Sequence, residues 1–191
     1  MNQPPAILRT AVSGLRTQYK ESGHQLRKSI ERVLKDNKRL KPEYAKPPAE
    51  NDRLYDSQYT HLAGQWNCAE FCNNSKLIFR PQRTEDEDDP AIHYGLIGSS
   101  NRVIKDAIFR DKLAVEKGVL CFKMEAAGLA NHFPCLVIRG ICDYADSHKC
   151  KEWQGYAAMV AAAYAKDLLC QIVPKRVNTE RKAREVLDGQ C

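Results

Sequence analysis

The sequence lacks any apolar run long enough to cross a membrane, and it begins without the pattern of a secretory signal. A membrane-spanning helix needs about 18–20 consecutive apolar residues, and no run in these 191 residues reaches that length. The first five residues, Met-Asn-Gln-Pro-Pro, contain neither the basic segment nor the apolar core of a signal peptide. No internal repeat is evident either. We therefore expect a soluble, cytoplasmic protein, and its length favours a single domain.

The chain contains eight cysteines, enough for a disulfide scaffold, but it lacks the secretory signal that such scaffolds carry. Four of the cysteines lie in apolar runs, where a cysteine acts as a small buried hydrophobic residue: Cys121, Cys135, Cys142 and Cys170. We therefore expect free thiols rather than disulfide bonds.

A zinc site is the other use of cysteines that the sequence raises, and we expect no metal and no bound cofactor. Cys68 and Cys72 are separated by three residues, and His61 lies upstream of them. A closed zinc site takes four ligands at known spacings, and the sequence offers only two cysteines and a distant histidine. The acidic run 85–89 is expected to be a solvated loop that ends at Pro90, with a cation site as an unsupported alternative.

The positive charge of the chain is concentrated near its start. Residues 1–48 hold eleven Lys/Arg against four Asp/Glu, whereas residues 49–90 hold four against nine. Much of the basic excess lies on one face of an expected helix from His24 to Leu40. A nucleic-acid surface is one interpretation of that face. We favour a solvated amphipathic face, because no aromatic or base-reading pattern accompanies the charge, and we expect no nucleic-acid partner.

Apolar spacing predicts helices over residues 5–40, followed by a long excursion over 42–90 that is rich in turn-forming residues. From residue 92 strands and helices alternate. We expect strands at Ile92–Ser100, Val119–Phe122 and Leu136–Ile138, and helices at Arg102–Lys117, Ala126–Ala130 and Glu152–Ile172. Gly118 is a suitable helix C-cap. This β-α-β-α-β-α order favours an α/β fold with a largely parallel sheet, and residues 174–191 read as a charged helical tail or linker.

Two acids stand at positions where such folds bind ligands. Asp143 follows the apolar run Leu136–Ile138, and α/β sheets bind ligands beyond the carboxyl ends of their strands. Glu125 stands between the Val119–Phe122 strand and a helix of small residues, where the helix dipole favours a carboxylate. Both also have purely structural interpretations, Glu125 as a helix-start carboxylate and Asp143 as a strand-end cap.

The sequences Met124-Glu125-Ala126-Ala127-Gly128 and Val137-Ile138-Arg139-Gly140-Ile141-Cys142-Asp143 carry a family resemblance. They resemble the C-terminal half of the purine nucleoside phosphorylase and uridine phosphorylase superfamily, which includes methylthioadenosine nucleosidases. The chain is most similar to fungal versions fused to ankyrin, tetratricopeptide or nucleotide-binding regions in large receptor-like proteins. The resemblance covers residues 1–173 and is densest over 92–173. It implies a partial three-layer fold, a mostly parallel sheet flanked by helices, with the N-terminal half of the domain missing.

What the resemblance implies is cleavage of the N-glycosidic bond of a nucleoside, a purine nucleoside by preference, with phosphate as a possible co-substrate. Glu125 matches the glutamate that accepts hydrogen bonds from the ribose diol, and Met124 matches the methionine under the sugar. Asp143 matches the acid that gives the leaving base a proton, which is general-acid catalysis. Ser99, Asn101 and Val103 are the candidates for the base pocket.

Three departures from the family pattern indicate a degenerate site rather than an active enzyme. Lys123 stands where the family usually has another glutamate, and a cation there competes for the lone pairs of Glu125. Asn101 and Val103 occupy positions that relatives fill with an aspartate and an aromatic that stacks on the base. The absent half would supply the phosphate turn and the group that activates water. We therefore hold two hypotheses: a nucleoside-cleaving domain, inactive as an isolated chain, or a nucleoside-sensing module of a larger protein. Exposed sheet edges favour self-association or burial within such a protein.

Overall fold

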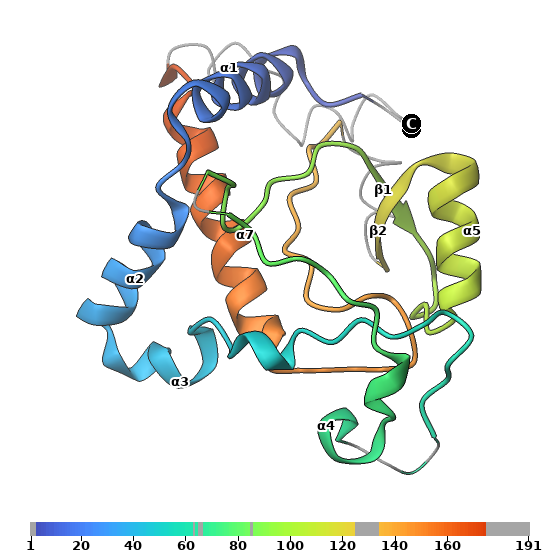
Figure 1. Ribbon diagram of the computed structural model, residues 1–191. Helices are drawn as coiled ribbons and strands as arrows, with labels where there is room; N and C mark the ends of the chain where they lie inside the picture. Colours follow the sequence, from blue (N-terminus) through green and yellow to red (C-terminus); the bar gives the residue numbers. More distant parts are fainter. Residues whose placement is uncertain (1–2, 63, 65–66, 85, 125–133, 175–191) are drawn as a thin grey trace.

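Two amphipathic helices and one largely apolar helix form the part of the protein that contains most of its buried residues. The computed structural model describes residues 3–62, 64, 67–84, 86–124 and 134–174. Helix α1 (Ala6–Ser22) and helix α2 (Leu26–Asp36) both pack against the long C-terminal helix α7 (Trp153–Cys170). The predicted helices over 5–40 and 152–172 are thereby confirmed, with ends a few residues inside the expected ones. Figure 1 shows α7 lying alongside both N-terminal helices.

The core consists of two clusters that share α7. In the first, Leu15, Leu26 and Leu168 are at most 3% exposed and pack with Tyr19 and Tyr164. Burial of each leucine contributes about 1.5–3 kcal/mol, so this contact fixes the helix arrangement. The second cluster joins residues of α2 to Tyr156 of α7. At the turn between α1 and α2, Gly23 has φ of 66°, a conformation that glycine adopts without steric cost.

Glycine also permits two close approaches to α7. A Cβ on Gly155 would stand 2.0 Å from the carbonyl oxygen of Glu43, which belongs to the short helix α3 (Lys41–Tyr44). A Cβ on Gly140 would stand 1.9 Å from the carbonyl oxygen of Ala157. Neither space admits a side chain, so both the end of α3 and the segment around Gly140 lie directly against the α7 backbone.

One β-α-β unit carries the parallel strands. Strand β1 (Leu96–Ser99) and strand β2 (Val119–Lys123) pair in parallel and are joined by helix α5 (Ala107–Lys117). Asp106 caps the start of α5 by accepting a hydrogen bond from the Phe109 N–H, and Gly118 caps its end with φ of 66°. The Gly118 cap and the Val119 strand are confirmed. The expected starts at Ile92 and Arg102 are wrong by four and five residues.

The third expected strand is wrong as a member of the sheet. Residues 134–142 form no ladder with another strand in the part of the chain that the structure describes. Leu136 and Ile138 pack instead against the α1–α7 cluster. In Figure 1 this segment passes as a thread beside α7 before the chain turns toward the helix. The apolar run is thus buried by helices, and the fuller three-layer sheet stays a prediction.

The excursion after α3 contains only short elements among its described residues. These are 3₁₀ turns at Ala49–Asn51 and Asn74–Lys76 and the single-turn helix α4 (Cys68–Phe71); a further 3₁₀ turn, Lys38–Leu40, lies just before α3. Tyr55, 1% exposed, forms an isolated antiparallel bridge with Leu77. The expected long loop is confirmed, and its centre is held by this bridge.

Two smaller expectations fail. The acidic run is docked at its C-terminal end, because Asp89 pairs with Lys46 at 2.6 Å and with Arg27 at 3.4 Å. Cys170 is exposed on α7 rather than buried, and Cys121, Cys135 and Cys142 are only partly buried. All seven cysteines that the structure describes are free thiols, as expected. Within the same described ranges, no helix is both long and apolar enough to span a membrane. The charged tail over 175–191 and the helix at Ala126–Ala130 lie outside the described residues.

Gly155 on α7 and Gly14 on α1 are both helical glycines, and substituting each by alanine gives a matched test of this packing. We expect Gly155→Ala to lower the free energy of unfolding by about 1–3 kcal/mol, because the methyl group collides with backbone. Gly14→Ala, on the exposed face of α1 with its nearest neighbour 3.9 Å away, should instead stabilise the protein by about 0.5–1 kcal/mol. Urea unfolding of the two variants measures both values, and equal effects would contradict the close contact between α3 and α7.

Candidate functional site

The carboxyl ends of the two strands bring several of the predicted site residues to one edge. Ser99 is paired with Lys123 in the parallel register, and the Ser100 N–H donates to the Lys123 carbonyl at 3.0 Å. Met124 therefore follows β2 at the same edge where Ser99 ends β1. Met124 is 45% exposed there. Glu125 lies outside the described residues.

The remaining base-pocket candidates lie in the turn after β1. Asn101 is exposed, and Val103 is 52% exposed. An exposed valine provides little apolar surface for a stacked base, whereas an aromatic ring at this position would provide a flat face. The edge of β1 and β2 is thus open, with one apolar side chain from each loop.

Asp143 lies at the end of the extended segment 134–142, on a loop that folds back on itself. Its carboxylate accepts a hydrogen bond from the Ala145 N–H at 2.8 Å and pairs with the Lys149 ammonium at 2.9 Å. Ala145 has φ of 51°, so the chain turns sharply at this point. The side chain of Asp143 is 24% exposed. Asp143 therefore has a structural role in its loop, where it accepts the Ala145 N–H, although the segment before it is not a strand of the sheet.

Arg139 is a further candidate site residue, and the sequence analysis gave it no role. It lies on the extended segment, and its Nε is buried without a hydrogen-bond partner among the described residues. Burial raises the pKa of the Cys121 thiol on β2, and the nearby Arg139 guanidinium acts in the opposite direction. Arg139 therefore lies close to β2. The signal in the sequence was a charged residue inside an apolar run.

The loop that follows Asp143 is anchored to helix α5 by Arg110. The guanidinium donates from Nη1 to the Tyr144 carbonyl at 2.7 Å and from Nη2 to Ser57 Oγ at 3.2 Å, and it pairs with Asp111 at 2.7 Å. Asp146, only 2% exposed, lies 4.0 Å from the same group. Burial raises the pKa of the Asp146 carboxyl. A single arginine thus joins α5, the excursion and the Asp143 loop.

Tyr144 adds a second link between the loop and the excursion. Its hydroxyl donates to Asp52 Oδ1 at 2.5 Å, and its ring lies 5.1 Å from the Arg80 guanidinium. Burial and the hydrogen bond to Asp52 raise the pKa of the Tyr144 hydroxyl. The two links together hold the residues directly after Asp143 against the excursion and α5.

The same excursion and loop bring four potential metal-binding side chains together, two histidines and two cysteines. One ligand-type atom each from His61, Cys68, Cys72 and His148 lies within 4.8 Å of the other three. His148 Nδ1 stands 3.5 Å from Cys72 Sγ and 3.8 Å from Cys68 Sγ. Burial and the neighbouring Cys72 raise the pKa of the Cys68 thiol to about 12. The sequence analysis named three of these four candidate ligands. It did not identify His148, which lies 76 residues after Cys72.

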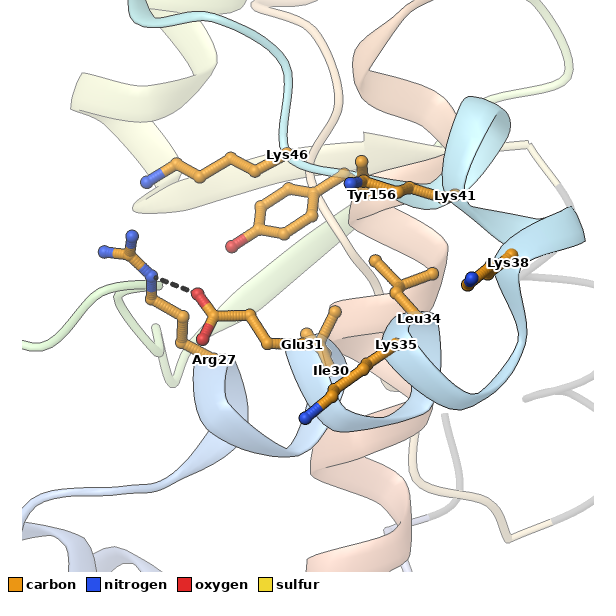
Figure 2. A pocket seen from close by; sticks show the side chains of 10 residues that line it. Arg27, Ile30, Glu31, Leu34, Lys35, Lys38, Lys41, Lys46 and Tyr156 are labelled. Atoms are coloured by element: carbon orange, nitrogen blue, oxygen red, sulfur yellow. Dashed lines mark hydrogen bonds and ion pairs between the residues drawn. The ribbon is translucent and has the colours of Figure 1, made fainter.

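The basic helix face forms a groove that is separate from these residues. Arg27, Lys35, Lys38, Lys41 and Lys46 surround a hollow of about 510 Å³ whose floor is Ile30, Leu34, Ala45 and Tyr156. Figure 2 shows Arg27 and Lys46 at one end of it, with Glu31 hydrogen-bonded to Arg27. Two of the five cations are thus already paired with acids of this chain. The amphipathic interpretation of the helix is supported, and the groove contains none of the predicted site residues.

Comparisons with known proteins give one informative match. No family model matches the sequence, and no solved structure matches it. Over 181 residues, 95% of this chain, the sequence is 43% identical to a protein of the fungus Hyaloscypha variabilis named nucleotide-binding leucine-rich repeat (NLR)-like protein. The chain spans only 17% of that protein's length. It is therefore similar to one part of a much longer protein.

The Arg110 contacts generate a prediction for the Asp143 loop. Arg110→Lys keeps the charge but loses the fork that reaches Tyr144 and Ser57 together, so it should destabilise the protein by about 1.5–3 kcal/mol. Arg32→Lys, on the exposed face of α2, should change stability by less than about 0.5 kcal/mol. Urea unfolding compares the two, and hydrogen exchange at Ala145 and His148 should accelerate in the first variant alone. Unchanged exchange at both amides would show that Arg110 does not hold the loop.

Proposed function

We propose that this chain is a nucleoside-binding module of a larger multidomain cytoplasmic protein. The observation that carries the proposal is Asp143, a partly buried carboxylate at the end of the Arg139-to-Asp143 motif, held in place by Ala145 and Lys149. A carboxylate fixed in this way has further lone pairs with which to accept hydrogen bonds from a ligand. The motif is the one that resembles nucleoside phosphorylases.

Three other side chains support a polar ligand between the extended segment and the strands. The Arg139 Nε has a hydrogen to donate and is buried without a partner among the described residues. Ser99 and Met124 end the neighbouring strands at one edge. A hydroxyl, a thioether and a guanidinium suit a sugar and a base better than they suit an apolar ligand. The base class favoured by the resemblance is a purine.

The contacts of Asp143 favour recognition over turnover. General-acid catalysis requires the Asp143 carboxyl to be free to approach the leaving base, whereas its Oδ1 is already in contact with Lys149 at 2.9 Å and with the Ala145 N–H at 2.8 Å. Val103, half-exposed, leaves the base without a stacking partner. We therefore expect the chain to bind nucleosides without releasing free base. N-glycosidic cleavage is the second candidate, and the observation that favours it is the pair of motifs containing Met124 and Asp143.

The size relation supports a place within a larger protein. The similar protein is nearly six times longer than the matching region, because that region covers 17% of it. That protein is named as nucleotide-binding and leucine-rich repeat-like. A small-molecule sensor domain is a suitable component of a protein with such an architecture. Within such a protein, the neighbouring regions would respond to the bound nucleoside, and the nucleoside would not be cleaved.

Calorimetry tests the proposal. Adenosine, inosine, uridine and methylthioadenosine are titrated into the chain with and without phosphate, and free base is measured by chromatography after long incubation. We expect binding of at least one purine nucleoside and no base release. Asp143→Asn should weaken that binding about 10-fold or more, because a charged hydrogen bond contributes about 1.5–3 kcal/mol.

The matched control is Glu116→Gln, which removes the carboxylate of the exposed ion pair between Glu116 and Lys112 on α5. It should leave nucleoside affinity unchanged. No detectable binding of any of the four nucleosides by a folded chain would overturn the proposal. Base release that disappears in Asp143→Asn would replace it with the catalytic candidate.

A further inference from the structure

We propose that His61, Cys68, Cys72 and His148 together bind one zinc ion in a closed structural site. The inference is independent of nucleoside binding and reverses the expectation from sequence that the chain binds no metal. The four residues come from two regions of the chain, the excursion and the loop after Asp143, which are far apart in sequence.

The separations of the side chains are close to those of a tetrahedral site. With zinc–sulfur bonds of about 2.3 Å and zinc–nitrogen bonds of about 2.0–2.1 Å, neighbouring ligand atoms stand about 3.3–3.8 Å apart. The two sulfur–nitrogen distances at His148 Nδ1 are 3.5 and 3.8 Å. All four atoms lie within 4.8 Å of one another, so small side-chain movements complete the site. The three-residue spacer between Cys68 and Cys72 also falls within the usual spacing of zinc cysteines.

The second nitrogen of each histidine is already oriented as a metal ligand requires. His148 Nε2 lies 2.9 Å from the Tyr59 carbonyl, and His61 Nδ1 lies 2.9 Å from the Leu62 carbonyl. A carbonyl only accepts, so each of these nitrogens must carry the proton. His148 Nδ1 and His61 Nε2 then bear the lone pairs. Hydrogen bonds of this kind fix the tautomer and orientation of zinc-ligating histidines.

The surroundings match a structural rather than a catalytic site. Cys72 and His148 are 8% and 6% exposed, and the rings of Tyr55 and Tyr59 stack on His148 with centroids 4.1 and 5.3 Å away. Four protein ligands leave no open position for water or substrate. Two thiolates also neutralise the ion, and zinc binding releases their protons to solvent. A cysteine–histidine nucleophile pair would use only Cys72 and His148 and leave Cys68 and His61 unexplained.

The proposed zinc would join the excursion to the loop that carries Asp143. Beside the four ligands, the backbone N–H of His61 in the excursion already donates to Ser147 Oγ in the loop at 2.9 Å. Within the loop, the backbone N–H of His148 donates to Asp146 Oδ1 at 2.9 Å. A metal bond from His148 to the excursion would restrain the loop more strongly than these hydrogen bonds. Metal removal is therefore expected to loosen the loop and lower the thermal midpoint of unfolding.

Metal content tests the proposal. The untagged chain is expressed in zinc-supplemented medium, purified without metal-affinity resin, dialysed and analysed by plasma mass spectrometry. We expect one zinc per chain. Cys68→Ser and His61→Ala, at the more exposed side of the cluster, should each weaken zinc affinity by about 100-fold or more in competition with a chromophoric chelator. The double variant Cys68→Ser/Cys72→Ser should retain no zinc.

Two substitutions outside the cluster are the matched controls. Cys170→Ser and His93→Ala, both at exposed positions, should keep full zinc content. Cobalt substitution gives a second readout on the wild-type chain, so the test does not depend on whether a ligand variant folds. A tetrahedral site with two cysteines should show thiolate-to-cobalt charge-transfer absorption that zinc abolishes.

Three results would overturn the inference. The first is a wild-type chain that contains no zinc and shows no charge-transfer band with cobalt. The second is zinc content that is equal in the wild type and in Cys68→Ser/Cys72→Ser. The third is a count of six free thiols rather than eight in the unfolded, unreduced wild-type chain, with all six remaining cysteines of Cys68→Ser/Cys72→Ser also free. That result would assign Cys68 and Cys72 to a disulfide.

Discussion

The close packing of the extended segment 134–142 against helix α7 sets the path of the chain that leads to Asp143. Gly140 stands so near the Ala157 carbonyl that no side chain fits between them, and Leu136 and Ile138 enter the cluster formed by α1 and α7. The segment is therefore buried through its side chains rather than through strand pairing. Its far end, Asp143, depends on other parts of the chain for its final position, because no ladder extends to it in the described residues.

Those other parts are polar and come from the excursion. Arg110, Tyr144 and Asp146 connect the loop to Ser57, Asp52 and α5 through hydrogen bonds and ion pairs. Such contacts are directional, and each buried donor or acceptor costs about 1–3 kcal/mol when its partner is lost. A loop held in this way is specific in geometry but sensitive to the loss of single partners. The proposed zinc ion would add a set of bonds that are both stronger and less dependent on the rest of the network.

The local elements were predictable because their signals are local. Apolar spacing along α1, α2 and α7 and the glycine after α5 determine those helices from nearby residues alone. The third strand failed because a run such as Leu136–Ile138 is apolar whether a sheet or a helix covers it, and only distant residues decide between them. His148 failed as a ligand for the same reason. Its partners Cys68 and Cys72 stand 80 and 76 residues away, and no spacing rule spans that distance. The sequence also could not predict the contacts of Lys149 and Arg139, because these depend on which carboxylate or strand the fold places beside them.

The same distant contacts bear on the choice between the proposed nucleoside binding and the alternative, N-glycosidic cleavage. General-acid catalysis would require the Asp143 carboxyl to contact the leaving base, yet its Oδ1 already contacts Lys149 at 2.9 Å and the Ala145 N–H at 2.8 Å within its own loop. The neighbouring buried acid, Asp146, is raised in pKa by burial, but it faces Arg110 and the His148 N–H rather than the strand edge. Rapid chemistry also requires the reacting groups to be held together, and here the strand edge with Ser99 and Met124 and the loop with Asp143 belong to separate elements. The proposed site is thus divided between separate elements, and this fits the proposed nucleoside binding better than the alternative, N-glycosidic cleavage.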